Sequence, residues 1–137
     1  MAGVENFNPE ELGPHPGFSH ASAHGALVIL GGQTGVDASG RILAPGDLVA
    51  QFRQAIGNVG RALRAAGSAP ENVLKLTYFV TDRDAYVAGA KEIGAAYRDV
   101  FGRHFPAMSL FEVTALYDRE AMIEIECIAG REPASSA

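Results

Sequence analysis

The sequence predicts a single α+β domain in which two amphipathic helices cover one face of a β-sheet. Three observations support this. The chain has 137 residues, a length that fits one domain. Two long stretches carry apolar residues at three- and four-residue spacing. Short β-rich stretches flank and separate them, in the order β(β)-α-β-α-β-β. Two helices that each bury one apolar stripe against a sheet give a two-layer architecture.

The first seventeen residues contain three prolines and little periodicity, so we expect an extended N-terminal arm over residues 1–17. Residues 26–33 form a short apolar run that closes with two glycines, which predicts a buried strand. After the turn residues 37–40, residues 41–43 are expected to return as a short strand.

The clearest helix is expected over Asp47–Ala66. Asp47 is a good N-cap residue, and Gly67 stands where a helix C′ residue belongs. Its apolar stripe consists of Leu48, Phe52, Ala55, Ile56, Val59, Ala62, Leu63 and Ala66.

The second half predicts a strand, a helix and two further strands. Residues 71–80 are β-rich, and a second helix follows, capped by Asp82 or Asp84 and stopped at Gly102. Its stripe includes Tyr86 and Tyr97, which together with Tyr78 suit packing between helix and sheet. Two closing strands are expected over residues 107–115 and 121–129. The domain should therefore occupy residues 1–130, followed by a flexible tail over 131–137.

Alternation in the last two strands predicts two different sheet faces. We expect one set to face the helices: Ser109, Phe111, Val113, Ala115, Ile123, Ile125, Cys127 and Ala129. The other set mixes apolar residues with carboxylates: Met108, Leu110, Glu112, Thr114, Met122, Glu124, Glu126 and Ile128. Such a face is typical of an oligomer interface with a polar pocket. An ordinary exposed sheet face is the alternative.

The composition is globular and excludes several function classes. Hydrophobic residues make up 47% of the chain and charged residues 20%. The formal charge is −5, and no basic stripe is present, so a nucleic-acid partner is not expected. The longest apolar runs fall far short of the ~20 residues of a membrane span, and no signal peptide opens the chain. We therefore expect a cytoplasmic protein with no membrane association.

Metal and disulfide chemistry are not expected either. The single cysteine, Cys127, has no partner for an internal disulfide and lies on the expected helix-facing side, as a core thiol would. The four histidines, at positions 15, 20, 24 and 104, lack metal-ligand spacing. No metal and no cofactor are therefore expected.

An ordered series of motifs resembles the RidA family, also called YjgF/YER057c/UK114, from about residue 7 to residue 129. Residues 16–21 (PGFSHA) resemble its Gly-Pro-Tyr-Ser-Gln-Ala segment, and residues 30–33 (LGGQ) resemble its Ser-Gly-Gln strand end. Residues 51–67 resemble its helix ending in Ala-Gly, and residues 73–82 its Val-Val-Lys strand. Residues 105–109 (FPAMS) resemble the Pro-Ala-Arg-Ser signature, and residues 123–129 (IEIECIA) the terminal Glu-Ile-Glu-x-Ile-Ala.

The resemblance implies a chorismate-mutase-like α+β subunit and a homotrimer with small-molecule clefts between neighbouring subunits. It implies substrate-binding positions at Phe18, Gly31, Gly32, Met108 and Ser109. It also implies that Glu126 is the catalytic carboxylate that positions water for imine hydrolysis. From the residues alone, Glu126 also fits a strand residue paired across an interface, and the two glycines also fit a strand-end turn.

The signature arginine is replaced here by Met108, which carries no charge and no hydrogen-bond donor. In deaminating members that arginine clamps the substrate carboxylate in a bidentate pair. Such charge-assisted bonds are worth roughly 1.5–3 kcal/mol, so carboxylate binding should weaken by one to two orders of magnitude. The family tyrosine is replaced by Phe18, which loses the hydroxyl. Arg103 and Arg119 are the nearest candidates to replace the lost guanidinium.

Three functions remain open from the sequence. The first is an enamine/imine deaminase-type hydrolase with an altered substrate. The second is a non-catalytic trimer that binds a small metabolite. The third is the ribonuclease activity often attached to the family, which the negative charge and missing basic stripe favour least.

Overall fold

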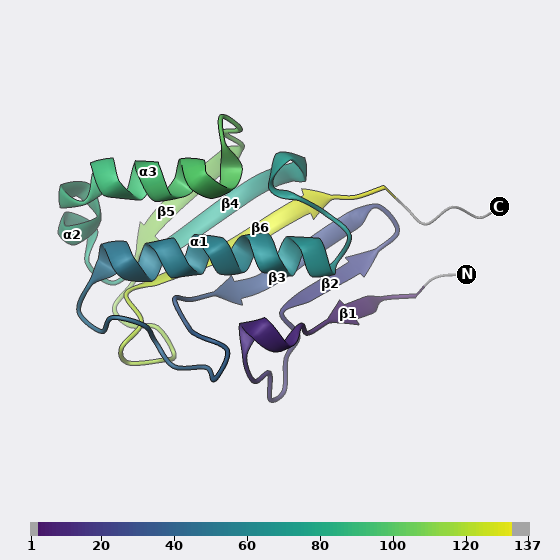
Figure 1. Cartoon of the computed structure of the whole chain (residues 1–137), viewed down its shortest axis with the longest axis horizontal. Coiled ribbons are helices and arrows are strands. Elements are labelled where there is room, and N and C mark those ends of the chain that lie inside the picture. The colour runs from purple at the N-terminus through teal and green to yellow at the C-terminus, as the bar shows by residue number, and fades with distance from the viewer. Residues whose placement is uncertain (1–2, 133–137) are drawn as a thin grey trace.

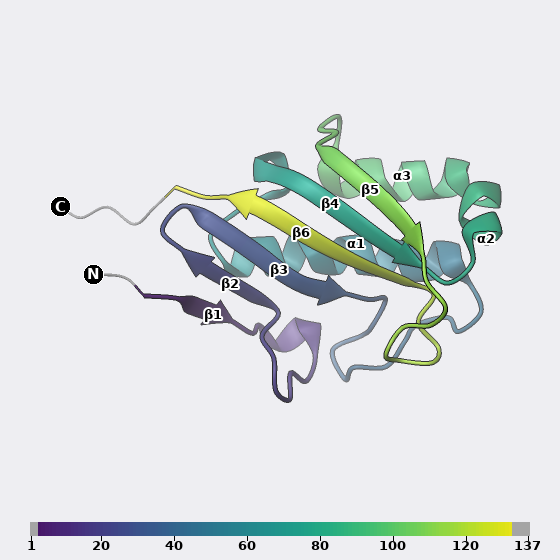
Figure 2. The same ribbon diagram turned by 180° about the vertical axis from the view of Figure 1, so that it is seen from behind.

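The computed structural model describes residues 3–132, which form one six-stranded sheet with helices on one side (Figure 1). The strand order is β1-β2-β3-β6-β4-β5; β4 and β5 run parallel and every other neighbouring pair is antiparallel. Figure 2 shows the opposite sheet face, which no helix covers. The α+β class and the two-layer arrangement are therefore as predicted. The strands are β1 Glu5–Phe7, β2 Ala21–His24, β3 Leu27–Gln33, β4 Val73–Val80, β5 Ala107–Glu112 and β6 Ile123–Gly130.

The core lies between the sheet and α1 (Leu48–Ala65), whose apolar stripe is buried as predicted. Asp47 caps the helix by accepting a hydrogen bond from the backbone N–H of Ala50 at 3.0 Å. Gly67 follows the helix at φ +78°, a conformation that glycine adopts without strain. The strand β6 lies at the centre of the sheet and presents four buried side chains to this core: Ile123, Ile125, Cys127 and Ala129.

The second predicted helix is two helices, α2 (Arg83–Ala88) and α3 (Ala90–Phe101), with the break at Gly89. A Cβ at Gly89 would lie 2.7 Å from Cγ2 of Val49 on α1. The glycine therefore allows α1 to lie close to the junction between α2 and α3. Asp82 caps α2 by accepting from the backbone N–H of Ala85 at 2.9 Å. Between the two possible caps, the structure selects Asp82.

The N-terminal segment is not the extended arm expected over residues 1–17. β1 pairs with β2, a short 3₁₀ helix spans Glu10–Leu12, and Leu12 is buried in the core. The sequence pattern missed both elements because β1 has only three residues and the prolines obscure the turn that follows it.

Several predicted bounds shift slightly. Residues 41–43 make only an isolated bridge, between Ile42 and Val36. A 3₁₀ helix over Pro70–Asn72 precedes β4, and β5 ends at Glu112 rather than residue 115. Of the predicted tail, Arg131 is anchored by hydrogen bonds to the carbonyls of Gly25 and Ala66. Residues 133–137 lie outside the described part of the chain.

Candidate functional site

A cavity of about 670 Å³ lies where β3 ends, under the segment that joins η1 (Glu10–Leu12) to β2. Its polar side chains include His20, Gln33, Asp118 and Glu124, and no lysine or arginine is among the described residues that line it. The apolar wall comes from the N-terminal segment, with Leu12 and Phe18 among its members. The cavity thus has the mixed lining of a small-molecule site.

Glu124 on β6 lies directly against Gly32 on β3. A Cβ on Gly32 would overlap the carboxylate of Glu124, and a Cβ on Gly31 would lie 2.9 Å from the carbonyl oxygen of Ser19. The pairing of β3 with β6 shifts register between Leu30 and Gln33, so both glycines occupy an irregular stretch. Because these two residues are glycines, the β3 backbone can contact both the Glu124 carboxylate and the covering segment at Ser19.

The position of Glu124 makes its carboxyl harder to ionise. Burial raises the pKa of Glu124, and the nearby negative charge of Glu126 raises it further. On the sheet, Glu124 is opposite Phe79, whose ring stacks on that of Phe111 at 6.0 Å. A carboxyl with a raised pKa, at the wall of a cavity, suits proton transfer in both directions near neutral pH.

His20 connects the cavity floor to its covering segment. Its Nε2 lies 3.3 Å from the carbonyl oxygen of Gly13, and its Nδ1 lies 3.3 Å from Nε2 of Gln33. The tautomer that satisfies both contacts donates from Nε2 to Gly13 and accepts at Nδ1 from Gln33. Burial lowers the pKa of His20, against an opposing contribution from the Gly13 carbonyl, and the charge of His15 lowers it slightly more.

Asn8 holds the end of the same segment, next to β2. Its Oδ1 accepts a hydrogen bond from the backbone N–H of His20 at 2.9 Å, and its Nδ2 donates to Oγ of Ser19 at 3.2 Å. The ring of Phe18 packs edge-on against that of His20, with centroids 5.4 Å apart, while Phe18 stays half exposed. The covering segment is therefore fixed at both ends by side-chain hydrogen bonds.

Three of the predicted site residues meet at this cavity: Phe18, Gly31 and Gly32. Glu126 does not line it. Its side chain is exposed on the open sheet face, where it stands opposite Thr77, whereas the resemblance placed the catalytic carboxylate at this position. Ser109 also lies outside the cavity, and its hydroxyl accepts a hydrogen bond from Nζ of Lys75 at 2.8 Å.

Met108 lines a second cavity, of about 260 Å³, between α3 and strands β4 and β5. The parallel pairing places Met108 beside Leu76 and Leu110 beside Tyr78, and these β4 residues face the helices. The predicted facing of residues 107–115 is therefore wrong. Both alternating sets in that strand contain apolar residues, and β5 is an edge strand, so alternation alone did not identify the buried face.

Sequence reasoning missed four residues at the two cavities: His20, Gln33, Glu124 and Arg98. Glu124 and Glu126 share one alternating set, so periodicity treats them alike, and only the register against Gly32 separates them. Arg98, from α3, lines the cavity of Met108, whereas the expected replacements Arg103 and Arg119 line neither cavity.

The side chains of His104 and Cys127 line neither cavity. The Nε2 of His104 lies 2.8 Å from the carbonyl oxygen of Val73, which ties the loop before β5 to β4. Cys127 is buried as predicted, and burial raises the pKa of its thiol to about 12, so the thiol stays protonated at neutral pH. Among residues 3–132, no helix has the length and apolar character that crossing a membrane requires.

The fold and the cavity define a two-layer α+β protein with a small-molecule-sized site at the end of β3. The chain belongs to the Endoribonuclease L-PSP family, which matches residues 9–130 and confirms the RidA-type resemblance. It is 33% identical over 129 residues to a 2-iminobutanoate/2-iminopropanoate deaminase of Capra hircus, covering 94% of this chain and 88% of that one. It is 34% identical over 112 residues to the RutC family protein UK114 of Drosophila melanogaster, covering 82% and 78%.

Solved structures agree with this assignment. The YjgF gene product of E. coli superposes with a TM-score of 0.79 at 32% identity, over 93% of this chain and 99% of that one. E. coli TdcF, solved with bound serine, superposes with a TM-score of 0.81 at 27% identity, over the same shares of the two chains.

Proposed function

We propose that this protein hydrolyses the C=N bond of a small enamine or imine, with Glu124 as the general acid and base. The observation that carries the proposal is the Glu124 carboxyl against Gly32 in the larger cavity, with its pKa raised by burial. Relatives that share about a third of their residues with this chain carry the name 2-iminobutanoate/2-iminopropanoate deaminase, which supports the same reaction class.

The reaction needs one water and returns one ammonia. Ionised Glu124 takes a proton from the attacking water while the oxygen bonds to the C=N carbon, and the protonated carboxyl then gives a proton to the nitrogen. The ionised carboxylate then takes the hydroxyl proton of the resulting amino alcohol and passes it to the nitrogen as the C–N bond breaks, so ammonia leaves and a carbonyl remains. Because burial raises the pKa of Glu124, its carboxyl holds a proton more readily than an exposed one, which favours the donating step.

The substrate should differ from a short 2-imino acid. Among the described residues, the Glu124 cavity is lined by no cationic side chain, and Met108 stands where the family motif has arginine. An anionic substrate would therefore meet no ion-pair partner within this cavity. A neutral enamine or imine fits the lining better.

We also propose that the protein assembles as a homotrimer through the open sheet face. That face exposes apolar side chains that would be unusual on a fully solvated sheet, including Ile29, Phe111 and Ile128. Because Met108 and Glu124 line separate cavities in one chain, Met108 reaches the Glu124 cavity only from a second copy. Light scattering after size-exclusion chromatography measures the mass directly, and a monomer would contradict the proposed cleft.

Ammonia release tests the reaction. A flavin amine oxidase acting on a primary amine generates an imine without a carboxylate in the presence of this protein, and Glu124→Gln should lower the release rate by about 10²-fold, the usual contribution of a general acid or base. Glu126→Gln removes the same charge from the same strand two residues away and should retain most activity. Loss of activity in Glu126→Gln but not in Glu124→Gln would restore the assignment that the sequence predicted.

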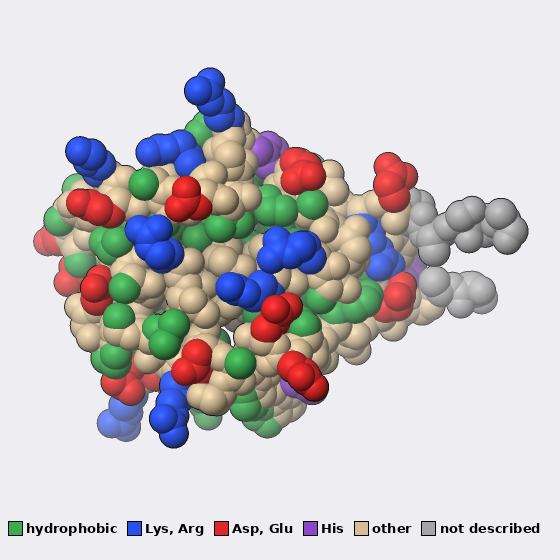
Figure 3. Space-filling view, in the orientation of Figure 1, with side chains coloured by type: hydrophobic (Ala, Val, Ile, Leu, Met, Phe, Trp, Pro, Cys, Tyr) green, Lys and Arg blue, Asp and Glu red, His purple; other side chains and the backbone are tan. Residues whose placement is uncertain are grey.

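A metabolite-binding trimer without catalysis is the second candidate, and the loss of the signature arginine at Met108 favours it. It predicts no ammonia release from any imine and the same ligand affinity in wild type and Glu124→Gln. Nucleic-acid cleavage has less support, because lysines and arginines on the helix face are interspersed with acidic residues and form no basic stripe (Figure 3).

A further inference from the structure

The buried side chain of Gln33 has one end without a hydrogen-bond partner. Its Nε2 lies 3.3 Å from the carbonyl oxygen of Gly31 and 3.3 Å from Nδ1 of His20, so both N–H groups of the amide are used. The Gly31 carbonyl can only accept, which fixes the orientation of the amide. Its other end, Oε1, therefore has no partner among residues 3–132.

This amide oxygen faces the larger cavity. In the described part of the chain, no buried side-chain oxygen lacks a hydrogen-bond partner, so Oε1 of Gln33 must have access to open space. Gln33 is only 2% exposed and lines the larger cavity, which therefore provides that access. An amide oxygen in this position accepts a hydrogen bond from an N–H or O–H group of a guest.

The charged side chains at the same cavity are acidic. Asp118 and Glu124 line it, and neither forms a salt bridge within residues 3–132. Oδ1 of Asp118 accepts a hydrogen bond from the backbone N–H of Glu120 at 2.9 Å, which leaves Oδ2 available to a guest. Burial lowers the pKa of His20, so its imidazole is neutral at pH 7 and does not offset these charges. The cavity therefore favours a positively charged guest.

Two exposed aromatic rings also line this cavity. Tyr117 is fully exposed and Phe18 is half exposed. Tyr117 directly precedes Asp118, so one loop supplies an aromatic face and a carboxylate. Aromatic faces attract organic cations, and a neighbouring carboxylate adds to that attraction.

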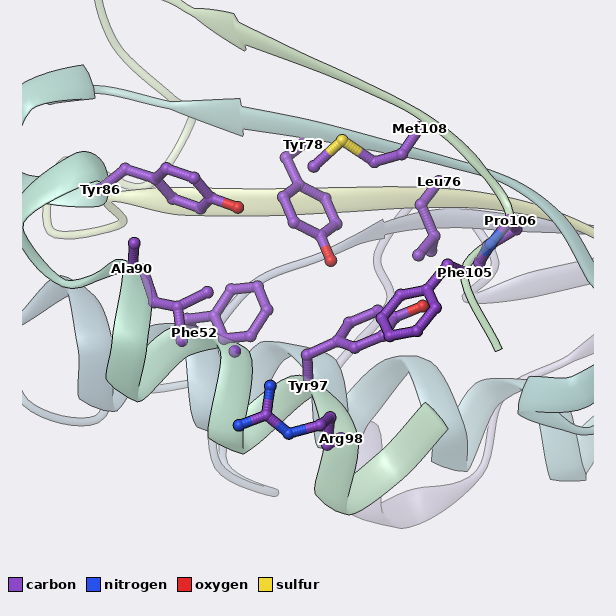
Figure 4. A pocket seen from close by; sticks show the side chains of 12 residues that line it. Phe52, Leu76, Tyr78, Tyr86, Ala90, Tyr97, Arg98, Phe105, Pro106 and Met108 are labelled. Atoms are coloured by element: carbon purple, nitrogen blue, oxygen red, sulfur yellow. The ribbon is translucent and has the colours of Figure 1, made fainter. Parts of the chain in front are cut away.

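The smaller cavity, beside Met108, has the opposite charge. Among the described residues that line it, Arg98 is the one that carries a charge (Figure 4). The two cavities share no lining residue. An organic cation should therefore enter the larger cavity and avoid the smaller one.

We infer that the substrate of the larger cavity is an imine without a carboxylate, held as its protonated cation. An iminium combines N–H donors with a positive charge. One N–H is donated to Oε1 of Gln33, and Asp118 balances the charge. This substrate class rests on the proposed function, because Glu124 carries out the hydrolysis in the same cavity.

Benzamidine is a stable probe of this binding mode. Its amidinium group is planar, cationic at neutral pH and rich in N–H donors, benzamide is its neutral isostere, and benzoate is the anionic one. In calorimetric titrations of the full chain, benzamidine should bind about fivefold more tightly than benzamide, the gain from one partly exposed ion pair. Benzoate should not displace benzamidine. Equal affinities for benzamidine and benzamide, or no binding of benzamidine, would refute the cationic substrate.

A variant of Asp118 separates charge from shape. Asp118→Asn should lower the affinity for benzamidine to that for benzamide and leave the affinity for benzamide unchanged. Glu120→Gln is the matched control, since it removes a charge from the same loop at a residue that does not line the cavity. It should change neither affinity. Equal losses of benzamidine affinity in the two variants would show that the charge of the whole loop attracts the cation, and would refute the role of Asp118.

A variant of Gln33 should behave differently from Asp118→Asn. Benzamidine and benzamide both carry N–H donors, so Gln33→Met should weaken both about fivefold through one lost hydrogen bond. Unchanged affinities for both ligands would refute the contact with Gln33. If this variant does not fold, the comparison of the three ligands on the wild-type chain still decides whether the cavity prefers a cation.

Turnover distinguishes the substrate class from the proposed reaction. Benzamidine should competitively inhibit ammonia release from the imine that a flavin amine oxidase forms from benzylamine, with hydrogen peroxide release as the check that the oxidase itself is not slowed. Charge-dependent binding of benzamidine without ammonia release from any imine would refute the hydrolysis and leave the cation site intact. Ammonia release that benzamidine does not inhibit would leave the hydrolysis intact and refute the cationic substrate.

Discussion

Gln33 and His20 form a buried side-chain pair, with Nε2 of Gln33 3.3 Å from Nδ1 of His20. The imidazole must be neutral to accept this hydrogen bond, because a protonated ring presents a donor at both nitrogens. The contact holds the covering segment on the floor of the larger cavity, so its protonation state bears on the whole site.

Lowering the pH should therefore reduce the stability of the folded protein through His20. Burial lowers the pKa of His20 below its ordinary 6.5, so below that pH the unfolded chain binds a proton that the native chain does not. The free energy of unfolding should fall as the pH drops from about 7 and level off below the native pKa. Chemical denaturation of wild type and His20→Gln between pH 7.5 and 5 measures this, and an equal slope in the two proteins would contradict it.

The effect of Glu124 on stability should depend on pH in the opposite direction. Its native pKa is raised above the ordinary 4.5, so the ionised form is disfavoured in the folded chain and the resulting loss of stability develops as the pH rises through the native pKa. Glu124→Gln should therefore unfold at a higher temperature than wild type at pH 7. The difference should vanish below about pH 4.5, where the carboxyl is neutral in both states. Differential scanning calorimetry at the two pH values provides the check.

Glu126 should tune the pH dependence of the reaction rather than perform it. Its charge contributes to the raised pKa of Glu124, so Glu126→Gln should shift the acidic limb of the rate profile to lower pH while keeping the maximal rate within about threefold. Ammonia release across pH 5–8 measures the shift. An unchanged profile would show that the two carboxylates do not interact.

Gly32 should tolerate no side chain. Because a Cβ there overlaps the Glu124 carboxylate, Gly32→Ala should cost about 1–3 kcal/mol of stability and lower ammonia release as well. Gly3→Ala is the matched control, since no atom lies within 4 Å of a Cβ at Gly3. Urea denaturation compares the two variants, and equal stabilities would show that the carboxylate moves aside without penalty.

The sequence predicted the large elements because each has a local signal. The apolar stripe from Leu48 to Ala66, the cap at Asp47 and the stop at Gly67 were sufficient for α1. The α2–α3 break at Gly89 was missed, because the apolar residues at helical spacing continue across it from Tyr86 to Tyr97. The short strand β1 was missed because pairing with β2, rather than its own composition, makes it a strand.

The site was predicted only in part for the same reason. Glycines 31 and 32 carry a visible motif, but the choice between Glu124 and Glu126 depends on which one faces the irregular pairing of β3 with β6. The side on which Met108 lies depends on its register beside Leu76. Both are relations between distant strands, which periodicity in a single strand does not contain.

The position of β6 has a consequence for how the protein is made. Among the strands of residues 3–132 this one is synthesised last, yet it lies between β3 and β4 and joins the two halves of the sheet. A nascent chain that ends before Ile123 has two separate sets of strands, each with an unpaired inner edge. Native assembly of the sheet must therefore wait until β6 has been synthesised, and termination before Ile123 would release a fragment with unpaired strand edges that favour aggregation.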